Sequence, residues 1–178
     1  EEGFDPDAVA VAARAAGGDL ERVRALLSDE AASQRWRRWS DLLGRVDGTA
    51  ATASGLVAEL IADLDAAGEA LAASHARQLE SFDHAEGDTP RGQTGRRKRL
   101  EERHKREARR LRNDALRAGM AALADEARAR AVDAAGAQTY GRVGDGLADL
   151  ELALLHNARE DLALLALLLA LGEPTPSL

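Results

Sequence analysis

The longest helical pattern in the sequence covers residues 95–136. Between Arg96 and Ala135 there is no proline and one interior glycine, Gly119, while Ala, Leu, Arg and Glu, which are strong helix formers, supply most of the residues. A single helix of this span would be roughly 60 Å long. Its expected buried face consists of residues that recur at intervals of three, four and seven: Leu100, His104, Ala108, Leu111, Ala115, Ala118, Ala122 and Ala129.

Two short helices are predicted at the start of the chain. Asp5-Pro6-Asp7 is a typical helix start, because Asp5 can cap free amides and Pro6 suits the first helical position. Gly17-Gly18 ends this helix, and Asp19 caps a second one. Residues 5–27 are therefore expected to form a small helical hairpin.

A third helix is predicted to begin at Ser28-Asp29, and it carries both tryptophans, Trp36 and Trp39. They are expected to anchor this helix to its neighbours, although the arginines beside them leave an exposed interaction patch as the alternative. A fourth helix is predicted from Thr52 or Ser54 to about Phe82. Residues 86–95 are rich in turn formers and predict a loop, so the fourth helix and the long helix should be antiparallel.

Gly136 is predicted to end the long helix, and Gly141, Gly144 and Gly146 to interrupt the segment after it. A sixth helix is expected around residues 147–155, with Leu147, Leu150, Leu154 and Leu155 as its apolar positions. Residues 157–161 read as the end of that helix and the start of a last one. The last helix is apolar on most sides, which predicts either the centre of a bundle or a subunit interface. Its leucines Leu162, Leu165, Leu168 and Leu169 share one side.

Composition supports an all-α fold and one main domain. The 178 residues are 45% hydrophobic but only 3% aromatic, so the core must consist mostly of Ala, Leu and Val, which suits closely packed helices. The longest apolar run, residues 162–171, is half of the ~20 residues that a membrane-spanning helix needs. The chain lacks cysteine, which favours an intracellular, cytoplasmic protein. Its start has neither an initiator methionine nor a secretion signal, so we expect a fragment.

The sequence contains no recognisable catalytic or cofactor motif. Gly-rich phosphate loops, GxSxG and HExxH are all absent. The four histidines, His75, His84, His104 and His156, are scattered, and only His75 and His84 are expected on one helix. We therefore predict no catalysis, no cofactor, no metal and no small-molecule substrate.

The strongest charge feature is the stretch of residues 96–112. It holds ten basic and three acidic residues, a charge of +7 against a total of −7, so the remainder carries −14. A solvated helix end is the simpler interpretation, because no aromatic residue interleaves the run for base stacking. The alternative is a nucleic-acid-binding helical module that uses Arg103, Arg106 and Arg110.

Three stretches, taken together, resemble the delta-prime subunits of bacterial DNA polymerase III clamp loaders, in the form found in high-GC Gram-positive bacteria. PDAVAVAARAAGGDLERVRALLSD, residues 6–29, resembles the end of an AAA+ helical lid. RLEERHKREARRLRNDAL, residues 99–116, is similar to a basic segment of that bacterial group and is the most specific of the three. NAREDLALLALLLAL, residues 157–171, resembles the last helix of clamp-loader collar domains. Together they cover nearly the whole chain.

The resemblance implies a lid remnant at residues 1–27, a helical collar domain at residues 28–172 and a loose tail at residues 173–178. It also implies a non-catalytic oligomerisation role in DNA replication, in which the last helix, through Leu162, Leu165, Leu168 and Leu169, holds subunits in a ring. The parent protein would be a subunit of the DNA polymerase III holoenzyme, a DNA-directed DNA polymerase. The implied partners are the ATP-binding gamma or tau type subunits and delta, with primed DNA involved indirectly and no membrane.

One position sharpens this assignment. In ATP-using clamp-loader subunits, an arginine three residues after the lid glycine reaches the nucleotide phosphates. Counted from Gly18, that position here is Glu21, although Arg22 lies beside it. A carboxylate would repel phosphate, which matches the implied lack of ATP binding in delta-prime subunits.

Overall fold

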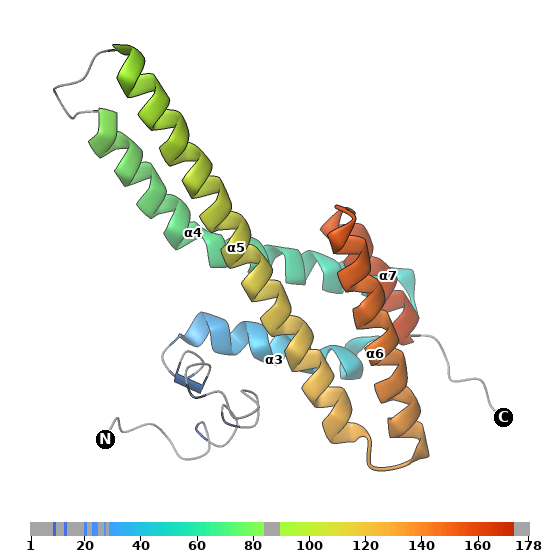
Figure 1. The fold of residues 1–178 in the computed structure, drawn as a ribbon. Coiled ribbons are helices and arrows are strands. Elements are labelled where there is room, and N and C mark those ends of the chain that lie inside the picture. Colours follow the sequence, from blue (N-terminus) through green and yellow to red (C-terminus); the bar gives the residue numbers. More distant parts are fainter. Residues whose placement is uncertain are drawn as a thin grey trace. The chain divides into compact units, whose positions relative to one another are not determined.

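The computed structural model describes residues 29–83 and 90–172, together with the isolated positions 9, 13, 20, 23, 24 and 27 (Figure 1). Over these residues it contains five helices and no strand, which confirms the predicted all-α helical bundle. The helical hairpin predicted for residues 5–27, with Glu21, lies largely outside the described residues, as does the predicted tail at residues 173–178.

The described residues divide into two compact units. Unit 1 contains those up to Ile61 and those from Ala118 onward, and unit 2 is Ala62–Arg117. Helix α4 (Ala50–Asp83) and helix α5 (Pro90–Arg130) are each divided between the two units. The domain boundaries predicted at residues 27/28 and 172/173 stay predictions, because residues next to them lie outside the described ranges.

Helix α3 (Glu30–Arg45) begins where the sequence predicted. The carboxylate of Asp29 accepts a hydrogen bond from the backbone N–H of Ala32 at 3.1 Å, and so caps the free helix end. Trp39 and Leu42 are each 1% exposed, whereas Trp36 is half-buried. Trp39 is therefore an anchor of the unit 1 core.

Helix α5 passes through Gly119 without interruption, and the indole of Trp39 lies directly against this glycine. A Cβ atom on residue 119 would lie 2.5 Å from Trp39 Cδ2 and closer still to Cε2 and Nε1. The glycine therefore lets α3 approach α5 within unit 1. Buried residues beyond Gly119 extend the packed part of α5: Met120, Ala122, Leu123 and Ala127.

The predicted ends of the long helix were both wrong. It begins at Pro90, so the loop prediction fails for residues 90–95, while residues 86–89 lie outside the described ranges. Proline fits a first helical position because the N–H that it lacks would have no partner there. The helix ends at Arg130 rather than at Gly136, because Asp133 caps the next helix by accepting from the N–H of Gly136 at 2.7 Å.

Helix α6 (Ala134–Leu155) contains the four glycines that were predicted to end or interrupt helices, so that prediction was wrong. Gly141 and Gly144 face open space, where the cost of a helical glycine is only about 1 kcal/mol. Gly146 is buried, and a Cβ on it would lie 2.8 Å from Leu167 Cδ1. This glycine allows α6 and α7 (Glu160–Gly172) to pack closely (Figure 1).

Helix α7 begins at Glu160, within the residues 157–161 that were predicted to hold the end of one helix and the start of the last, and Asn157 takes a left-handed backbone conformation there (φ 59°). Its far end meets the loop between α3 and α4: Gly48 has φ 78°, and a Cβ on it would lie 2.6 Å from the carbonyl oxygen of Gly172. Only glycine allows these two backbones to approach so closely. The buried side of α7 consists of Ala163, Leu164, Leu167, Leu168 and Leu171.

Unit 2 is an antiparallel helix pair, as predicted. Asp83 pairs with Arg97, Gln78 with His104, His75 with Glu107, and Asp65 with Arg112, so positions rise along α5 as they fall along α4. Among the large apolar side chains of this unit, Leu64 and Leu116 are fully buried. Its middle is instead occupied by polar side chains.

Candidate interaction surfaces and a buried histidine pair

Three exposed leucines flank the turn between α6 and α7 in unit 1. Leu152 and Leu155 belong to the last turn of α6 and are 54% and 76% exposed, and Leu162 in the first turn of α7 is 54% exposed. We call this set the leucine corner. Large apolar side chains that stay exposed beside one turn are candidates for a site of protein contact.

The four leucines predicted as a subunit interface do not share one environment. Leu162 belongs to the leucine corner, and Leu165 and Leu169 are half-buried. Leu168 is 1% exposed and packs inside unit 1. Spacing alone grouped them, because it does not tell which side of an all-apolar helix faces its own core.

Two leucines of the corner were missed or misplaced by the sequence pattern. Leu152 received no role, and Leu155 was expected on the apolar side of its helix with Leu150. Leu150 is indeed 2% exposed, and a helical wheel drawn from it would have put Leu152 on the opposite side.

The arginines predicted to contact DNA all lie on the exposed side of α5 in unit 2. Arg103 reaches Gln78 and Glu107, and Arg110 lies 3.7 Å from Asp114. No carboxylate among the described residues pairs with Arg106. The structure thus brings the three onto one helix surface without assigning them a ligand.

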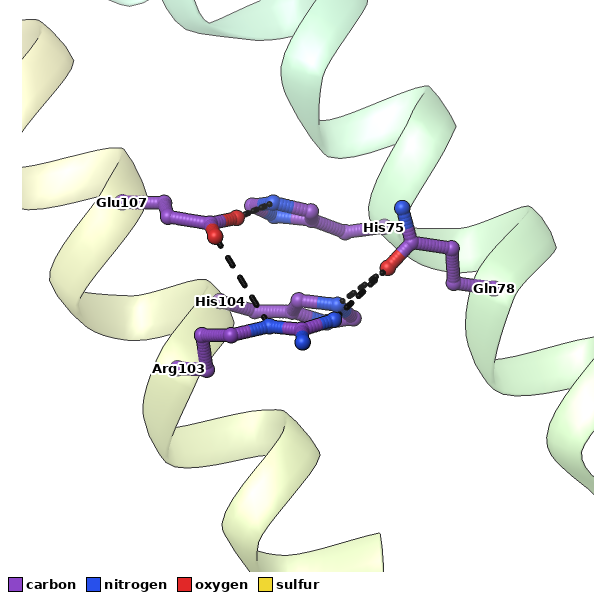
Figure 2. Close-up of polar contacts among 5 residues, drawn as sticks. All are labelled: His75, Gln78, Arg103, His104 and Glu107. Atoms are coloured by element: carbon purple, nitrogen blue, oxygen red, sulfur yellow. Dashed lines mark hydrogen bonds and ion pairs between the residues drawn. The ribbon is translucent and has the colours of Figure 1, made fainter.

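A pair of stacked histidines occupies the middle of unit 2 (Figure 2). His75 of α4 and His104 of α5 are 8% and 6% exposed, and their parallel rings lie 3.9 Å apart. His75 Nε2 lies 2.9 Å from a carboxylate oxygen of Glu107, and His104 Nε2 lies 2.9 Å from Gln78 Oε1. Each ring is therefore held by a side chain of the opposite helix.

These contacts fix which nitrogen of each ring donates a hydrogen bond. Glu107 and Gln78 offer acceptor oxygens, so Nε2 of each histidine donates a hydrogen bond. Nδ1 of neutral His104 is then the unprotonated nitrogen, and it is buried with no hydrogen-bond partner among the described residues. A second proton on His104 would have no acceptor there.

This geometry does not favour metal binding. Both Nε2 atoms already donate to side chains, and parallel rings cannot direct their nitrogens at one ion. No group of three or more His, Cys, Asp or Glu residues within the described ranges could hold a metal. The pair instead joins α4 to α5 where the apolar core is thin.

The sequence placed His104 on the buried face of its helix but compared His75 only with His84, which lies outside the described residues. Positions that are equally distant from the turn of an antiparallel hairpin face each other. With the predicted loop at residues 86–95 centred near residue 90, that rule would have placed His75 close to His104.

Stability should fall in mild acid because of His104. Burial, followed by the nearby His75 and the Arg103 cation, lowers the pKa of His104 below its ordinary value of 6.5. In mild acid the unfolded chain therefore binds a proton at His104 more readily than the folded chain does. The contribution of neutral His104 to the free energy of unfolding is complete above about pH 6.5 and is lost as the pH falls through the lower pKa of the folded state. We expect the free energy of unfolding of wild-type protein to drop between about pH 7.5 and 5.5.

The measurement is urea denaturation across this range, with imidazole titration by NMR. His104→Gln should flatten the pH dependence, and His156→Gln, which replaces an exposed histidine, is the control. A wild-type His104 that titrates at or above 6.5 would contradict the prediction.

The chain has no significant match to a family model, to a curated protein or to a solved structure. None of the helices in the described ranges combines the length and the apolar character that crossing a lipid bilayer requires.

Proposed function

We propose that this chain is a non-catalytic assembly module, the collar part of a delta-prime type clamp-loader subunit that acts in the cytoplasm. The observation that carries the proposal is the leucine corner of unit 1, Leu152, Leu155 and Leu162. The partners come from the resemblance of residues 6–29, 99–116 and 157–171: ATP-binding clamp-loader subunits of the gamma or tau type, and delta. The module would take part in loading a sliding clamp during DNA replication, without cofactor or small-molecule substrate.

The leucine corner has the energetic properties of a contact site. Full burial of one exposed leucine side chain is worth about 1.5–3 kcal/mol, so covering the exposed parts of all three would contribute about 3–5 kcal/mol. Association costs a comparable or larger amount in lost rotation and translation. The leucines therefore supply the apolar centre of an interface, and surrounding residues such as the half-buried Leu165 and Leu169 complete it.

The proposal is tested by gel filtration with light scattering on this chain, alone and mixed with the collar domains of ATP-binding clamp-loader subunits from the same organism. A stoichiometric mixed complex is expected. The assignment would be overturned if the chain forms no mixed complex with those collar domains at protein concentrations well above those at which a stable ring assembles.

Charge in the leucine corner should prevent assembly without unfolding the chain. Leu155→Asp and Leu162→Asp place a carboxylate on an exposed position, so the thermal midpoint should change little, whereas a desolvated carboxylate at the interface should weaken the mixed complex at least a hundredfold. Both properties are measured on the same samples, by thermal denaturation and by light scattering.

Val132→Asp is the matched control, because Val132 is 88% exposed in unit 1 but lies in the turn between α5 and α6. This variant should assemble normally. Normal assembly of both leucine variants would show that the corner is not the interface.

A further inference from the structure

Four arginines form a regular row on the exposed side of α5 within unit 2. Arg99, Arg106, Arg110 and Arg117 are separated by seven, four and seven residues, which places them within about 40° of one another around a helix. All four are exposed, and they extend over about 27 Å of the helix. We call this row the arginine stripe.

The arginines of α5 fall into two groups according to whether they pair with a carboxylate of α4. Arg97 and Arg112 reach carboxylates of α4, Asp83 and Asp65, so their charges are used inside unit 2. Within the described ranges, Arg99 and Arg106 of the stripe have no carboxylate partner.

The other two members of the stripe have only weak partners. Arg110 and Arg117 share the single carboxylate of Asp114 at 3.7 and 3.9 Å, and their side chains are 86% and 74% exposed. Ion pairs this long and this exposed contribute little to stability. Unit 2 therefore does not need these charges for its own fold.

We infer that the arginine stripe binds the phosphate backbone of a nucleic-acid duplex without reading its bases. Guanidinium groups form paired hydrogen bonds with phosphate oxygens, and successive arginines of the stripe are about 10.5, 6 and 10.5 Å apart along the helix axis. A duplex carries one phosphate charge per ~1.7 Å of its axis, so a 27 Å row finds a phosphate near each arginine.

The chemistry of the same face favours a duplex over other polyanions. Between the arginines the exposed side of α5 carries Glu102, Asn113 and Asp114 and no large apolar side chain, whereas a helix that lies in a lipid surface needs an apolar face. The described part of this face also has no aromatic ring on which the bases of a single strand could stack.

The net charge of the chain limits the salt concentrations at which this binding can be measured. The chain as a whole carries −7, which opposes a polyanion, while residues 62–117 alone carry thirteen basic and eleven acidic residues. Binding is therefore local to the stripe, strongest at low salt and independent of sequence.

The test is fluorescence anisotropy of the full chain with a labelled DNA duplex of about 20 base pairs, titrated with salt from about 50 to 200 mM. Four phosphate contacts predict a slope of log K against log salt of about −3.6, which is a roughly 100-fold loss of affinity over this range. Arg99→Gln, Arg106→Gln and Arg110→Gln combined should reduce the slope to about −0.9 and the loss to roughly fourfold, and should weaken low-salt binding at least tenfold.

The matched control combines Arg37→Gln, Arg128→Gln and Arg159→Gln, which removes the same charge from exposed arginines of unit 1. It should retain the wild-type slope. Equal effects of the two triple variants would mean that net charge, not the stripe, determines binding, and would overturn the inference.

Two further probes separate other ligands. No binding of the duplex at low salt overturns the inference, as does tighter binding of an oligothymidine strand. Binding of phosphatidylcholine–phosphatidylserine vesicles in place of the duplex would also overturn it. The inference does not depend on assembly through the leucine corner, because the stripe lies in unit 2 and is measured on the chain alone.

Discussion

Replacing Gly119 by alanine is expected to lower the free energy of unfolding by about 2 kcal/mol or more, although alanine is the better helix former. The new Cβ would overlap the indole of Trp39, a rigid ring that is 1% exposed and enclosed by the unit 1 core. The gain in helix propensity, about 1 kcal/mol, does not offset an overlap that forces the ring or the helix to move. The measurement is urea denaturation followed by tryptophan fluorescence, which also reports the displaced ring.

Gly141→Ala and Gly144→Ala provide the control for this substitution. Both glycines lie inside α6, in the same unit, and a Cβ on either meets nothing within 4 Å. Each should stabilise the protein by about 0.5–1 kcal/mol through helix propensity alone. If Gly119→Ala also proved stabilising, the packing of Trp39 against α5 would be refuted.

Leu168→Asp is expected to abolish the folding of unit 1. Leu168 is 1% exposed, so the substitution removes a buried leucine, at a cost of about 2–5 kcal/mol, and places a carboxylate where it has no partner, at several kcal/mol more. The sum is of the same order as the total stability of a typical domain, about 5–15 kcal/mol. Far-UV circular dichroism and hydrogen exchange should show loss of the protected amides of α6 and α7.

Leu162→Asp is the comparison within the same helix. Leu162 is 54% exposed and lies in the first turn of α7, where a carboxylate interacts favourably with the helix dipole. This variant should keep its secondary structure and its protected amides. A folded Leu168→Asp protein would contradict the assignment of Leu168 to the unit 1 core, and loss of folding in Leu162→Asp would contradict the exposure of the leucine corner.

The two proposed surfaces belong to different units and have opposite chemistry. The leucine corner of unit 1 is apolar and suits a protein partner, whereas the arginine stripe of unit 2 is cationic and suits phosphate. Because α4 and α5 contribute to both units, the assembly and DNA-binding variants should each be checked for the stability of the whole chain.

The beginnings of α3 and α7 could be predicted closely, and the beginnings of α5 and α6 could not. Asp29 and the turn at Asn157 are local signals that act within one helical turn. Pro90 and Asp133 are equally local, but the nearby Gly95 and Gly136 predict helix ends that the structure does not have. A helical glycine costs only about 1 kcal/mol, which a good cap and tertiary packing can exceed.

Local sequence was sufficient to show that the chain is helical, that Trp39 and Leu42 belong to a core and that the fourth helix and the long helix are antiparallel. These properties follow from periodicity and loop length, which act over short stretches of chain. The packed structure was needed to show that His75 stacks on His104 and that Leu168 is covered while Leu162 is not. Those outcomes depend on how the helices pack against one another, and no single helix encodes which side its neighbour will occupy.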